Sequence, residues 1–311
     1  MAEVQKDVRL YYQGVDITDE VDIIECVMQD RSGAAADCLN LKVDHADEWF
    51  RWGTQKNDKI RVTRAGYDSK TMFLNTIVPE DGAYRIYATG TKAVPFAARW
   101  QAFEKMQFQA IMAGCAGECG MGFGSWGVNA GEYRYLMRQN ESAPVFMERL
   151  ANREGAVLKS MDGRFTAIGI LYAQGLQAMH TVELEDDQLD SEYIDRRDLS
   201  WSGVEIRSLF GNGKAKDATA GGAQNRVITD LCVEDDATAY RWAKGILMNH
   251  NRQSEILNLT MDFNPGYTAM VHIKVSSQTD AKGDWVIDRV EQDLLNGRTK
   301  ARMLRSVTGI G

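Results

Sequence analysis

Two cysteines one helical turn apart are the residues whose type and spacing most resemble a metal-ligand pair. Cys115 and Cys119 fall four residues apart on one apolar stripe, where two thiolates could bind a metal ion. A structural zinc site needs four ligands, and the sequence offers no second cysteine or histidine pair at ligand spacing. Reduced cysteine is a frequent core residue, so we interpret the pair as core packing.

Histidines and the remaining cysteines could in principle form a nucleophile–base pair. They lie far apart in the chain, and no spacing brings them together. His272 lies in an alternating run, on the face opposite Val271 and Ile273, which predicts a position facing solvent or a lumen. The set comprises His45, His180, His250, His272, Cys26, Cys38 and Cys232.

A glycine-rich segment, Gly120–Gly127, reads GMGFGSWG and superficially resembles a phosphate-binding loop. A dinucleotide-binding loop follows a strand and opens a helix, whereas this segment follows a helical stripe. Its serine spacing also differs from that of the G-x-S-x-G nucleophile elbow. We therefore interpret it as a flexible connection.

A run of carboxylates, Glu183–Asp187 with Asp190 and Glu192, could bind Ca²⁺. The run lacks the glycine and the final glutamate of an EF-hand loop. A solvated face or an electronegative lumen wall is the favoured interpretation. No catalytic, cofactor-binding or metal-binding residue is predicted.

A second small-residue segment, Gly211–Asn225, contains no apolar residue larger than alanine. This composition predicts the most flexible part of the chain. We expect it either to be a disordered surface loop or to become ordered when a partner docks. The candidate partner-contact residues are Asn212, Lys214, Lys216 and Asp217.

Alternating apolar runs near both ends of the chain predict two related β-modules. Runs of four to eight residues bounded by Gly, Asp, Asn or Ser are typical of an antiparallel meander. Ile60 and Ile273 occupy equivalent places, and the same offset relates Met72 to Trp285. The runs are Ile60–Thr63, Met72–Val78 and Ala83–Thr89, and then Met270–Val275, Trp285–Val290 and Thr299–Leu304.

The first domain, residues 1–92, is predicted to be all-β. Strands are expected at Val8–Tyr12, Val21–Val27 and Cys38–Val43, because apolar side chains alternate there. Asp47–Gly53 carries three aromatic residues and is expected to form a short helical turn.

The second domain, residues 93–169, is predicted to be a small α/β insert. Glu104–Cys119 has a helical apolar stripe. A second helix is expected between Ser142 and Gly155, with a serine N-cap, a proline in its first turn and a glycine after its end. Asp162 and Gly163 predict the turn of a hairpin.

The third domain, residues 170–311, is predicted to be the second β-module with one helix in it. Asp235 or Asp236 is expected to begin that helix. Further strands are expected at Thr181–Glu185, Leu199–Phe210 and Ile256–Phe263.

Composition limits the class of protein. The 311 residues carry a net charge of −8, which argues against a nucleic-acid binder, because neutralising phosphates needs an excess of Lys and Arg. No run approaches 18 apolar residues, and the N-terminus lacks the pattern of a secretory signal, so no membrane insertion is expected. We expect folding in a cytoplasm, where the five cysteines stay reduced.

The order of several segments resembles the phage late control protein D family, the baseplate hub proteins of contractile tails. Asn57–Val62 (NDKIRV) resembles the family's GDxIxV strand entry, and Tyr133–Gly155 contains a match to its FLxRLAxxxG helix. Ala237–His250 resembles its AxxxAxxxL helix. Gly283–Val290 and Gly297–Leu304 resemble the terminal hairpin, although the usual histidine is absent or replaced by Asp293.

The resemblance implies a fold and an assembly. Hub proteins of this family are trimers whose subunits each carry two tail-tube-type β-barrels, so that three subunits form a pseudo-six-fold ring between a six-fold tube and a three-fold spike. The expected fold class is therefore mainly β (α+β), with two tail-tube-like β-barrel modules, a small α/β domain between them and a helix in the second module.

The leading functional hypothesis is a structural baseplate hub of a phage tail or tail-like particle, without enzymatic activity. The alternatives are a tail-associated cell-wall hydrolase or other tail-delivered enzyme, and a plain binding module. Expected partners are further copies of the chain in a homotrimer, the tail tube protein, the spike protein, and wedge or tape-measure proteins. We expect assembly in the bacterial cytoplasm and a final location in the baseplate.

Overall fold

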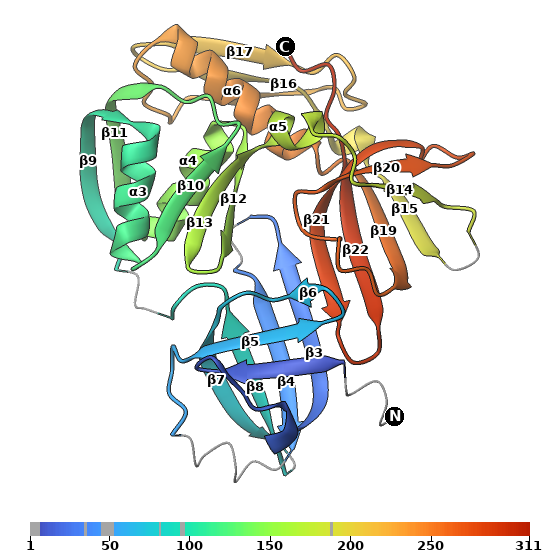
Figure 1. The fold of residues 1–311 in the computed structure, drawn as a ribbon. Helices are drawn as coiled ribbons and strands as arrows, with labels where there is room; N and C mark the ends of the chain where they lie inside the picture. The colour runs from blue at the N-terminus through green and yellow to red at the C-terminus, as the bar shows by residue number, and fades with distance from the viewer. Residues whose placement is uncertain (1–6, 34–35, 45–52, 81, 94–96, 187–188) are drawn as a thin grey trace.

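Three bodies are visible in the computed structural model: a first β-module (blue to teal), a second β-module (mainly red, with β14 and β15 yellow) and an α/β body (green to orange) (Figure 1). Strands make up most of the regular structure, so the prediction of a mainly β fold is confirmed. His45 and most of the expected helical turn at Asp47–Gly53 fall outside the described residues. The structure describes residues 7–33, 36–44, 53–80, 82–93, 97–186 and 189–311.

The first β-module is an antiparallel sheet with the strand order β1-β5-β7-β8-β4-β3. Alternate side chains, such as Leu39, Leu41 and Val43 on β4, are fully buried in its core, while those between them point to the other face. The strands are β1 (Val8–Tyr12), β3 (Asp22–Arg31), β4 (Cys38–Asp44), β5 (Lys59–Arg64), β7 (Met72–Glu80) and β8 (Ala83–Thr89), with short β2 (Val15–Asp16) and β6 (Tyr67–Asp68) at the side.

The second β-module repeats this plan with the order β14-β20-β21-β22-β19-β15. Trp285, Ile287 and Met303 lie in its core. The expected closing meander is present as β20, β21 and β22. The strands are β14 (His180–Glu183), β15 (Asp190–Asp195), β19 (Glu255–Asp262), β20 (His272–Ser276), β21 (Gly283–Asp293) and β22 (Arg298–Arg305).

The six main strands are connected in the same order in both modules. In each, the first strand along the chain lies beside the fourth, followed by the fifth, sixth, third and second. One difference is that β14 runs parallel to β20, whereas β1 runs antiparallel to β5. The closure of each sheet into a barrel stays a prediction.

The backbone repeats in detail at the start of each meander. Ile60 pairs with Met72, and Ile273 pairs with Trp285 at the same sequence offset. The pairing register shifts after Leu74 in β7 and after Ile287 in β21, and these two positions are related by the same sequence offset.

A left-handed residue precedes both irregularities. Asn57 and Met270 each have φ +72°. Asn57 N–H donates to Leu74 O over 2.7 Å, and Met270 N–H donates to Ile287 O over 2.8 Å. A non-glycine residue at positive φ is uncommon, so its recurrence at the same offset is strong evidence that the modules are two copies of one design.

One long strand joins the modules. The first part of β21 pairs with β20, and its last part pairs with β3 of the first module from Arg289–Arg31 to Asp293–Val27. The two modules therefore share one 14-stranded sheet.

The α/β body has a core of its own. Helices α3 and α4 and the β10-β13-β12 sheet pack against the β9-β11 ribbon. Phe103 of β9 stacks on Phe146 of α4 with ring centroids 5.4 Å apart. The elements are β9 (Arg99–Gln107), α3 (Phe108–Glu118), β10 (Gly122–Trp126), β11 (Glu132–Glu141), α4 (Ala143–Arg153), β12 (Ala156–Met161), β13 (Arg164–Gly169) and α5 (Ile170–Gly175).

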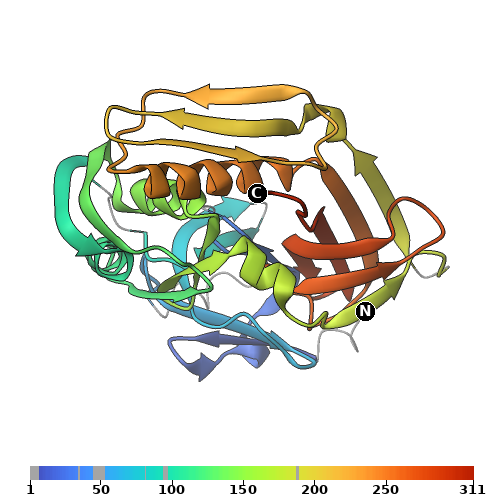
Figure 2. The same cartoon turned by 90° about the horizontal axis from the view of Figure 1, so that it is seen from above.

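A second segment of the chain completes this core. Helix α6 and the β17-β16-β18 sheet lie side by side over the body (Figure 2). Val204, Ile206, Ala215 and Trp242 are buried in the same cluster as the insert residues, so this helix packs on the α/β body and not inside the second β-module, where it was expected. The elements are β16 (Trp201–Arg207), β17 (Asn212–Lys216), β18 (Gln224–Ile228) and α6 (Asp236–Asn251).

The helix termini follow their sequence signals. Asp235 caps α6 by accepting a hydrogen bond from Thr238 N–H over 2.7 Å. Gly155 follows α4 with φ +66°, as expected for a glycine after a helix end. Among the described residues, no helix combines the length and the apolar composition needed to cross a membrane.

Candidate assembly surfaces

Three of the four expected partner-contact residues lie in a strand and not in a loop, and Asp217 directly follows that strand. Asn212, Lys214 and Lys216 belong to β17, which pairs with β16, for example Lys214 with Glu205. The expectation of a flexible segment from Gly211 onward is therefore wrong over 212–216.

The physical reason is close packing of the backbone on helix α6. A Cβ atom at Gly213 would lie 2.1 Å from the backbone nitrogen of Tyr240, and one at Gly211 would lie 2.3 Å from the carbonyl carbon of Asp235. Glycine is thus required because the strand touches the helix, which a flexible linker would not need.

Only three of the four residues are placed to contact a partner. Asn212, Lys214 and Lys216 are exposed or partly exposed, and the Lys214 ammonium lies 3.6 Å from Glu205. Asp217 is buried and accepts hydrogen bonds from Asn251 Nδ2 over 2.7 Å and from Thr219 N–H over 2.8 Å. Asp217 therefore fastens β17 to α6, and partner contact by the other three stays a proposal.

The cysteine pair lies in the core of the α/β body. Cys115 and Cys119 are 1% and 2% exposed, which confirms the core-packing interpretation. Burial raises the pKa of Cys115 to about 12, so its thiol stays protonated and is a poor nucleophile or metal ligand.

The three described histidines, His180, His250 and His272, make structural contacts. His272 was expected to face solvent, but it is buried, with Nδ1 2.6 Å from Leu176 O and Nε2 3.2 Å from Asp284. The expectation is wrong because the start of β20 is covered by the segment that follows α5. His180 stacks on Tyr267, and His250 stacks on Trp201.

The glycine-rich segment Gly120–Gly127 is also more regular than expected. Gly122–Trp126 forms β10, which runs parallel to β13. A Cβ at Gly127, where φ is +64°, would lie 2.0 Å from Tyr172. Gly127 therefore provides close packing, and the segment forms a strand of a sheet and not a phosphate cradle.

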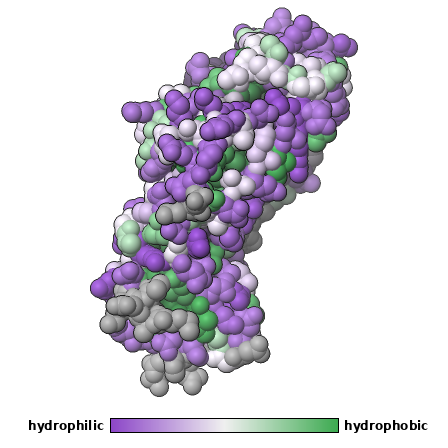
Figure 3. Space-filling model, turned by 90° about the vertical axis from the view of Figure 1, so that its right-hand side faces the viewer, coloured by the Kyte–Doolittle hydropathy of each residue, from purple (hydrophilic) through white to green (hydrophobic). Residues whose placement is uncertain are grey.

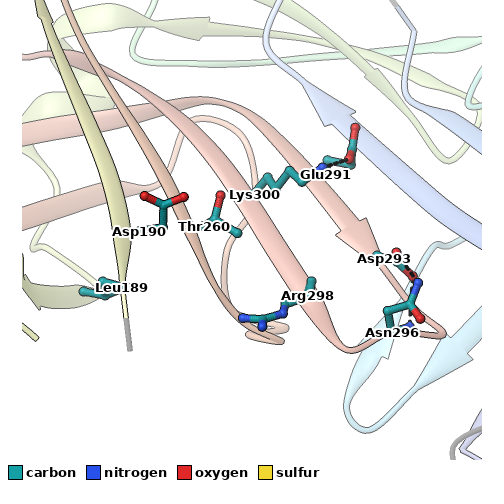
Figure 4. Close-up of a pocket in the computed structure, with 8 residues that line it drawn as sticks. All are labelled: Leu189, Asp190, Thr260, Glu291, Asp293, Asn296, Arg298 and Lys300. Atoms are coloured by element: carbon teal, nitrogen blue, oxygen red, sulfur yellow. Dashed lines mark hydrogen bonds and ion pairs between the residues drawn. The ribbon is translucent and has the colours of Figure 1, made fainter. Parts of the chain in front are cut away.

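Charged side chains cover the outer face of the second β-module. A hollow of about 590 Å³ lies there over β15, β19, β21 and β22 (Figure 4). Lys300 lies 3.1 Å from Glu291, and Asn296 donates to Asp293 over 2.7 Å. Within the described part of the chain, no three His, Cys, Asp or Glu residues are grouped to hold a metal ion. The hollow is a mixed-charge surface and has no nucleophile–base arrangement.

The same face of the first β-module carries a comparable network. Arg85 of β8 donates to Glu80 over 3.0 Å and to Glu25 over 3.1 Å, and Lys42 lies 3.3 Å from Glu80. The side of the molecule drawn in Figure 3 is mainly hydrophilic, with smaller apolar areas between hydrophilic ones. Such surfaces suit contact with water or with other charged chains more than a small apolar ligand.

A buried charge cluster joins the three bodies. Lys159 of β12 contacts Asp30 of β3, and its ammonium lies 3.1 Å from Asp37. Asp30 also accepts a hydrogen bond from Ala269 N–H of the second module over 3.0 Å. No sequence pattern predicts this cluster, because Lys159 lies more than a hundred residues from both carboxylates.

Electrostatics in the cluster are unbalanced, since one lysine faces two carboxylates. Burial raises the pKa of Asp37 to about 7, and the Lys159 charge opposes this shift. Burial also lowers the pKa of Lys159, but the charges of Asp30 and Asp37 outweigh it and the pKa is raised. The lysine therefore stays charged at neutral pH.

Solved structures with the same architecture are tail proteins. The 43 kDa tail protein of prophage MuSo2 from Shewanella oneidensis superposes with a TM-score of 0.69 and 13% identity, over 96% of each chain. The tail protein from Neisseria meningitidis MC58 superposes with a TM-score of 0.70 and 13% identity, again over 96% of each chain. The chain has the fold of phage tail proteins.

A third structure extends the likeness to a secretion machine. An Escherichia coli component of the type VI secretion system, described as structurally similar to the T4 bacteriophage tail proteins gp27 and gp5, has a TM-score of 0.56 and 9% identity. The match covers 94% of this chain and 76% of that one. No protein-family model matches the sequence, and no curated protein matches it either.

Proposed function

We propose that this chain is a structural baseplate hub of a contractile phage tail or tail-like particle. In this role it forms a homotrimer with pseudo-six-fold symmetry that joins the tail tube to the central spike. The proposal includes the absence of enzymatic activity. Among the described residues, Cys26, Cys115 and His272 are buried, and His180 and His250 stack on aromatic rings.

The duplicated β-module carries the proposal. Three copies of a chain with one module would present three equivalent units, whereas three copies of this chain would present six. The recurrence of strand order, pairing and the left-handed residues Asn57 and Met270 supports six comparable units. The likeness to tail proteins supports the location in a tail.

The proposed partners follow from this position. The ring would contact the tail tube protein on one side and the spike protein on the other, with wedge or tape-measure proteins around or within it. Asn212, Lys214 and Lys216 are the proposed partner contacts on the α/β body. Assembly would take place in the bacterial cytoplasm before the particle is released.

Deleting the gene in a strain that makes such particles tests the proposal. We expect the deletion to abolish complete tails in electron micrographs, and an epitope tag on the restored chain to be labelled at the baseplate end. Complete tails in the deletion strain, or labelling elsewhere on the particle, would contradict the proposed function.

A further inference from the structure

The pairing between β3 and β21 inside the chain indicates how two copies of the chain contact each other. Inside the chain, β21 of the second module pairs along one edge with β3 of the first module. If the modules are equivalent, the counterpart of β21, which is β7, should accept the counterpart of β3, which is β15. Both counterparts are in the structure, and among the described residues neither has a strand partner at that edge.

The register of the two modules defines these counterparts. Strand pairing can be followed across each sheet from β7 through β8 and β4 to β3, and from β21 through β22 and β19 to β15. Gln29 of β3 then corresponds to Ile194 of β15, and Met28 corresponds to Tyr193. Residues paired side by side across the four strands show the match. They are Ile77, Ile86, Leu41 and Cys26 in the first module, and Val290, Ala301, Leu259 and Ser191 in the second.

Among the described residues, the last part of β7 has no strand partner on the side where the last part of β21 pairs with β3. Only Met72 and Phe73 of β7 pair with β5. Beyond the contacts of Leu74 with residues 57 and 58, the described residues place no strand against that side. The last part of β21 is covered at the corresponding positions by β3.

The edge of β15 is open in the same sense. It pairs with β19 on one side and ends the sheet on the other, as far as the described residues show. Its counterpart β3 pairs on both sides. Unpaired strand edges are templates for joining another chain.

Burial of the side chains agrees with two missing neighbours. Val290 and Gln292 of β21 are 0% and 1% exposed, whereas their counterparts Ile77 and Pro79 are partly exposed and exposed. On the other strand, Met28 is buried and its counterpart Tyr193 is only partly buried.

Side-chain chemistry favours the same register. Inside the chain, Gln29 donates to Glu291 over 3.2 Å across the β3–β21 pair. The counterparts of these two polar residues are Ile194 and Val78, and Val78 is 41% exposed. An apolar pair at the edge of a surface is stabilised when the two side chains cover each other.

We propose that β15 of one copy pairs antiparallel with the last part of β7 of a second copy, with Ile194 opposite Val78. This inference rests on the proposed function, because it supplies the contact that would close the ring. The two edges lie on different modules, so the contact is head-to-tail and repeats from copy to copy.

Two features limit the strength of this contact. Pro79 has no N–H, so the pair that it forms with Tyr193 has one backbone hydrogen bond fewer than its counterpart inside the chain. The register also brings Glu80 opposite Glu192, although Arg85 and Lys42 already neutralise Glu80. The contact between copies should therefore be weaker than the β3–β21 contact inside the chain.

Disulfide trapping tests the register. In the pairing of β3 with β21, the flanking bonds Leu294 N–H to Cys26 O and Ser32 N–H to Asp288 O show that residues 291 and 29 form a non-hydrogen-bonded pair. Such pairs have Cα atoms about 4.5 Å apart, which is within disulfide range. The exposed Cys232 is first replaced by serine.

In that background, the double variant V78C/I194C of the full chain is oxidised at high concentration and separated under non-reducing conditions. We expect covalent oligomers up to a closed trimer, and loss of these species with the out-of-register control V78C/D190C. Mixing the V78C variant with the I194C variant should give a covalent dimer, and neither variant alone should do so.

Several results would overturn the inference. A dimer from V78C alone would show that two β7 edges face each other. Equal trapping of the control would show random contact, and a chain that stays monomeric and untrapped would show that the edges do not pair. A second variant, V78K, should lower the oligomer fraction in mass photometry, whereas V15K, at a 62% exposed valine of β2, should not.

Different results would contradict the inference about strand pairing and the proposed function. Labelled chain at the baseplate without in-register trapping would overturn the inference alone. In-register trapping of a chain that is dispensable for tails would overturn the proposed function alone.

Discussion

Asp37 is a buried residue whose protonation is linked to folding. Its carboxyl shares Lys159 with Asp30 in the buried cluster, and burial raises its pKa to about 7. The usual pKa of an aspartate is about 3.9, so between these values the folded chain binds more protons than the unfolded chain. The Asp37 contribution to stability is therefore complete at low pH and is lost as pH rises through 7.

Asp37→Asn should remove this dependence, because asparagine mimics the neutral carboxyl. We expect the melting temperature of the variant, relative to that of the native chain, to rise between pH 5 and pH 8, with a free-energy difference on the order of 1–4 kcal/mol at the upper end. Thermal unfolding across this range measures it. Asp262→Asn, at a carboxylate whose side chain is 82% exposed, is the matched control, and equal profiles for both variants would contradict the prediction.

Glu154 connects several elements of the α/β body through hydrogen bonds to its carboxylate. Its carboxylate, 1% exposed, accepts hydrogen bonds from Tyr133 and Trp242 over 2.6 Å and from Arg241 over 2.7 Å. These donors come from β11 and α6, so one carboxylate holds the end of α4 to two other elements.

Glu154→Ala should destabilise the chain by about 3–5 kcal/mol, because it leaves a partly buried guanidinium without its partner. Chemical denaturation followed by tryptophan fluorescence is a direct measurement, since Trp242 reports on the site. Glu132→Ala, at an exposed glutamate of β11, should change stability by less than about 0.5 kcal/mol. Similar effects of the two substitutions would show that the network is not energetically important.

At the scale of elements, the contact between β17 and α6 determines the geometry of the upper layer. Gly213 lies against the backbone of the helix, and backbone atoms cannot move aside as a flexible side chain can. The strand and the helix should therefore separate if any side chain is introduced there.

Gly213→Ala should destabilise the chain by roughly 1–3 kcal/mol through overpacking. Gly114→Ala is the matched control, because a Cβ at that exposed position in helix α3 meets nothing within 4 Å. The control should stabilise the chain by about 0.5–1 kcal/mol through helix propensity. Melting temperatures that shift in the same direction for both variants would argue against close packing at Gly213.

Local patterns in the sequence predict local structure well here and miss contacts between distant segments. Alternation in Ala83–Thr89 and the cap at Asp235 act within a few residues, and both elements are found as expected. The helix expected from Glu104 begins only at Phe108, because β9 continues to Gln107 as a partner of β11. A propensity stripe cannot show that competing pairing.

Glycine-rich segments were misinterpreted for a related reason. Flexibility and close packing both require glycine, and only the position of helix α6 or of Tyr172 distinguishes them. The buried set of Lys159, Asp30 and Asp37 likewise depends on how three bodies meet, which no spacing within the sequence encodes. The boundaries of the domains at residues 93 and 170 stay predictions.

At the scale of the whole molecule, the shared sheet and the charge cluster make the three bodies depend on one another. Strand β21 belongs to the second module and pairs with the first, and Asp30 contacts both the α/β body and the second module. We therefore expect the chain to unfold in one cooperative transition, although its length would allow separate transitions.

Lys159→Ala should weaken that dependence. It leaves Asp30 and Asp37 buried without a cation, which costs about 3–5 kcal/mol, and we expect differential scanning calorimetry to show a broadened or divided transition. Lys282→Ala, at an exposed lysine of the loop before β21, should keep the transition single. Two transitions in the native chain would contradict the expected single cooperative unfolding transition.

The left-handed residue shared by the two modules has an evolutionary consequence. The same backbone is held by asparagine at position 57 and by methionine at position 270, so the copies have kept a geometry while their sequences diverged. Fusion in one gene lets selection act on each copy separately. Asp30 could acquire a lysine partner from the α/β body, while its counterpart Asp195 pairs with Arg197. A ring of identical single modules would have to carry every such change at all its positions.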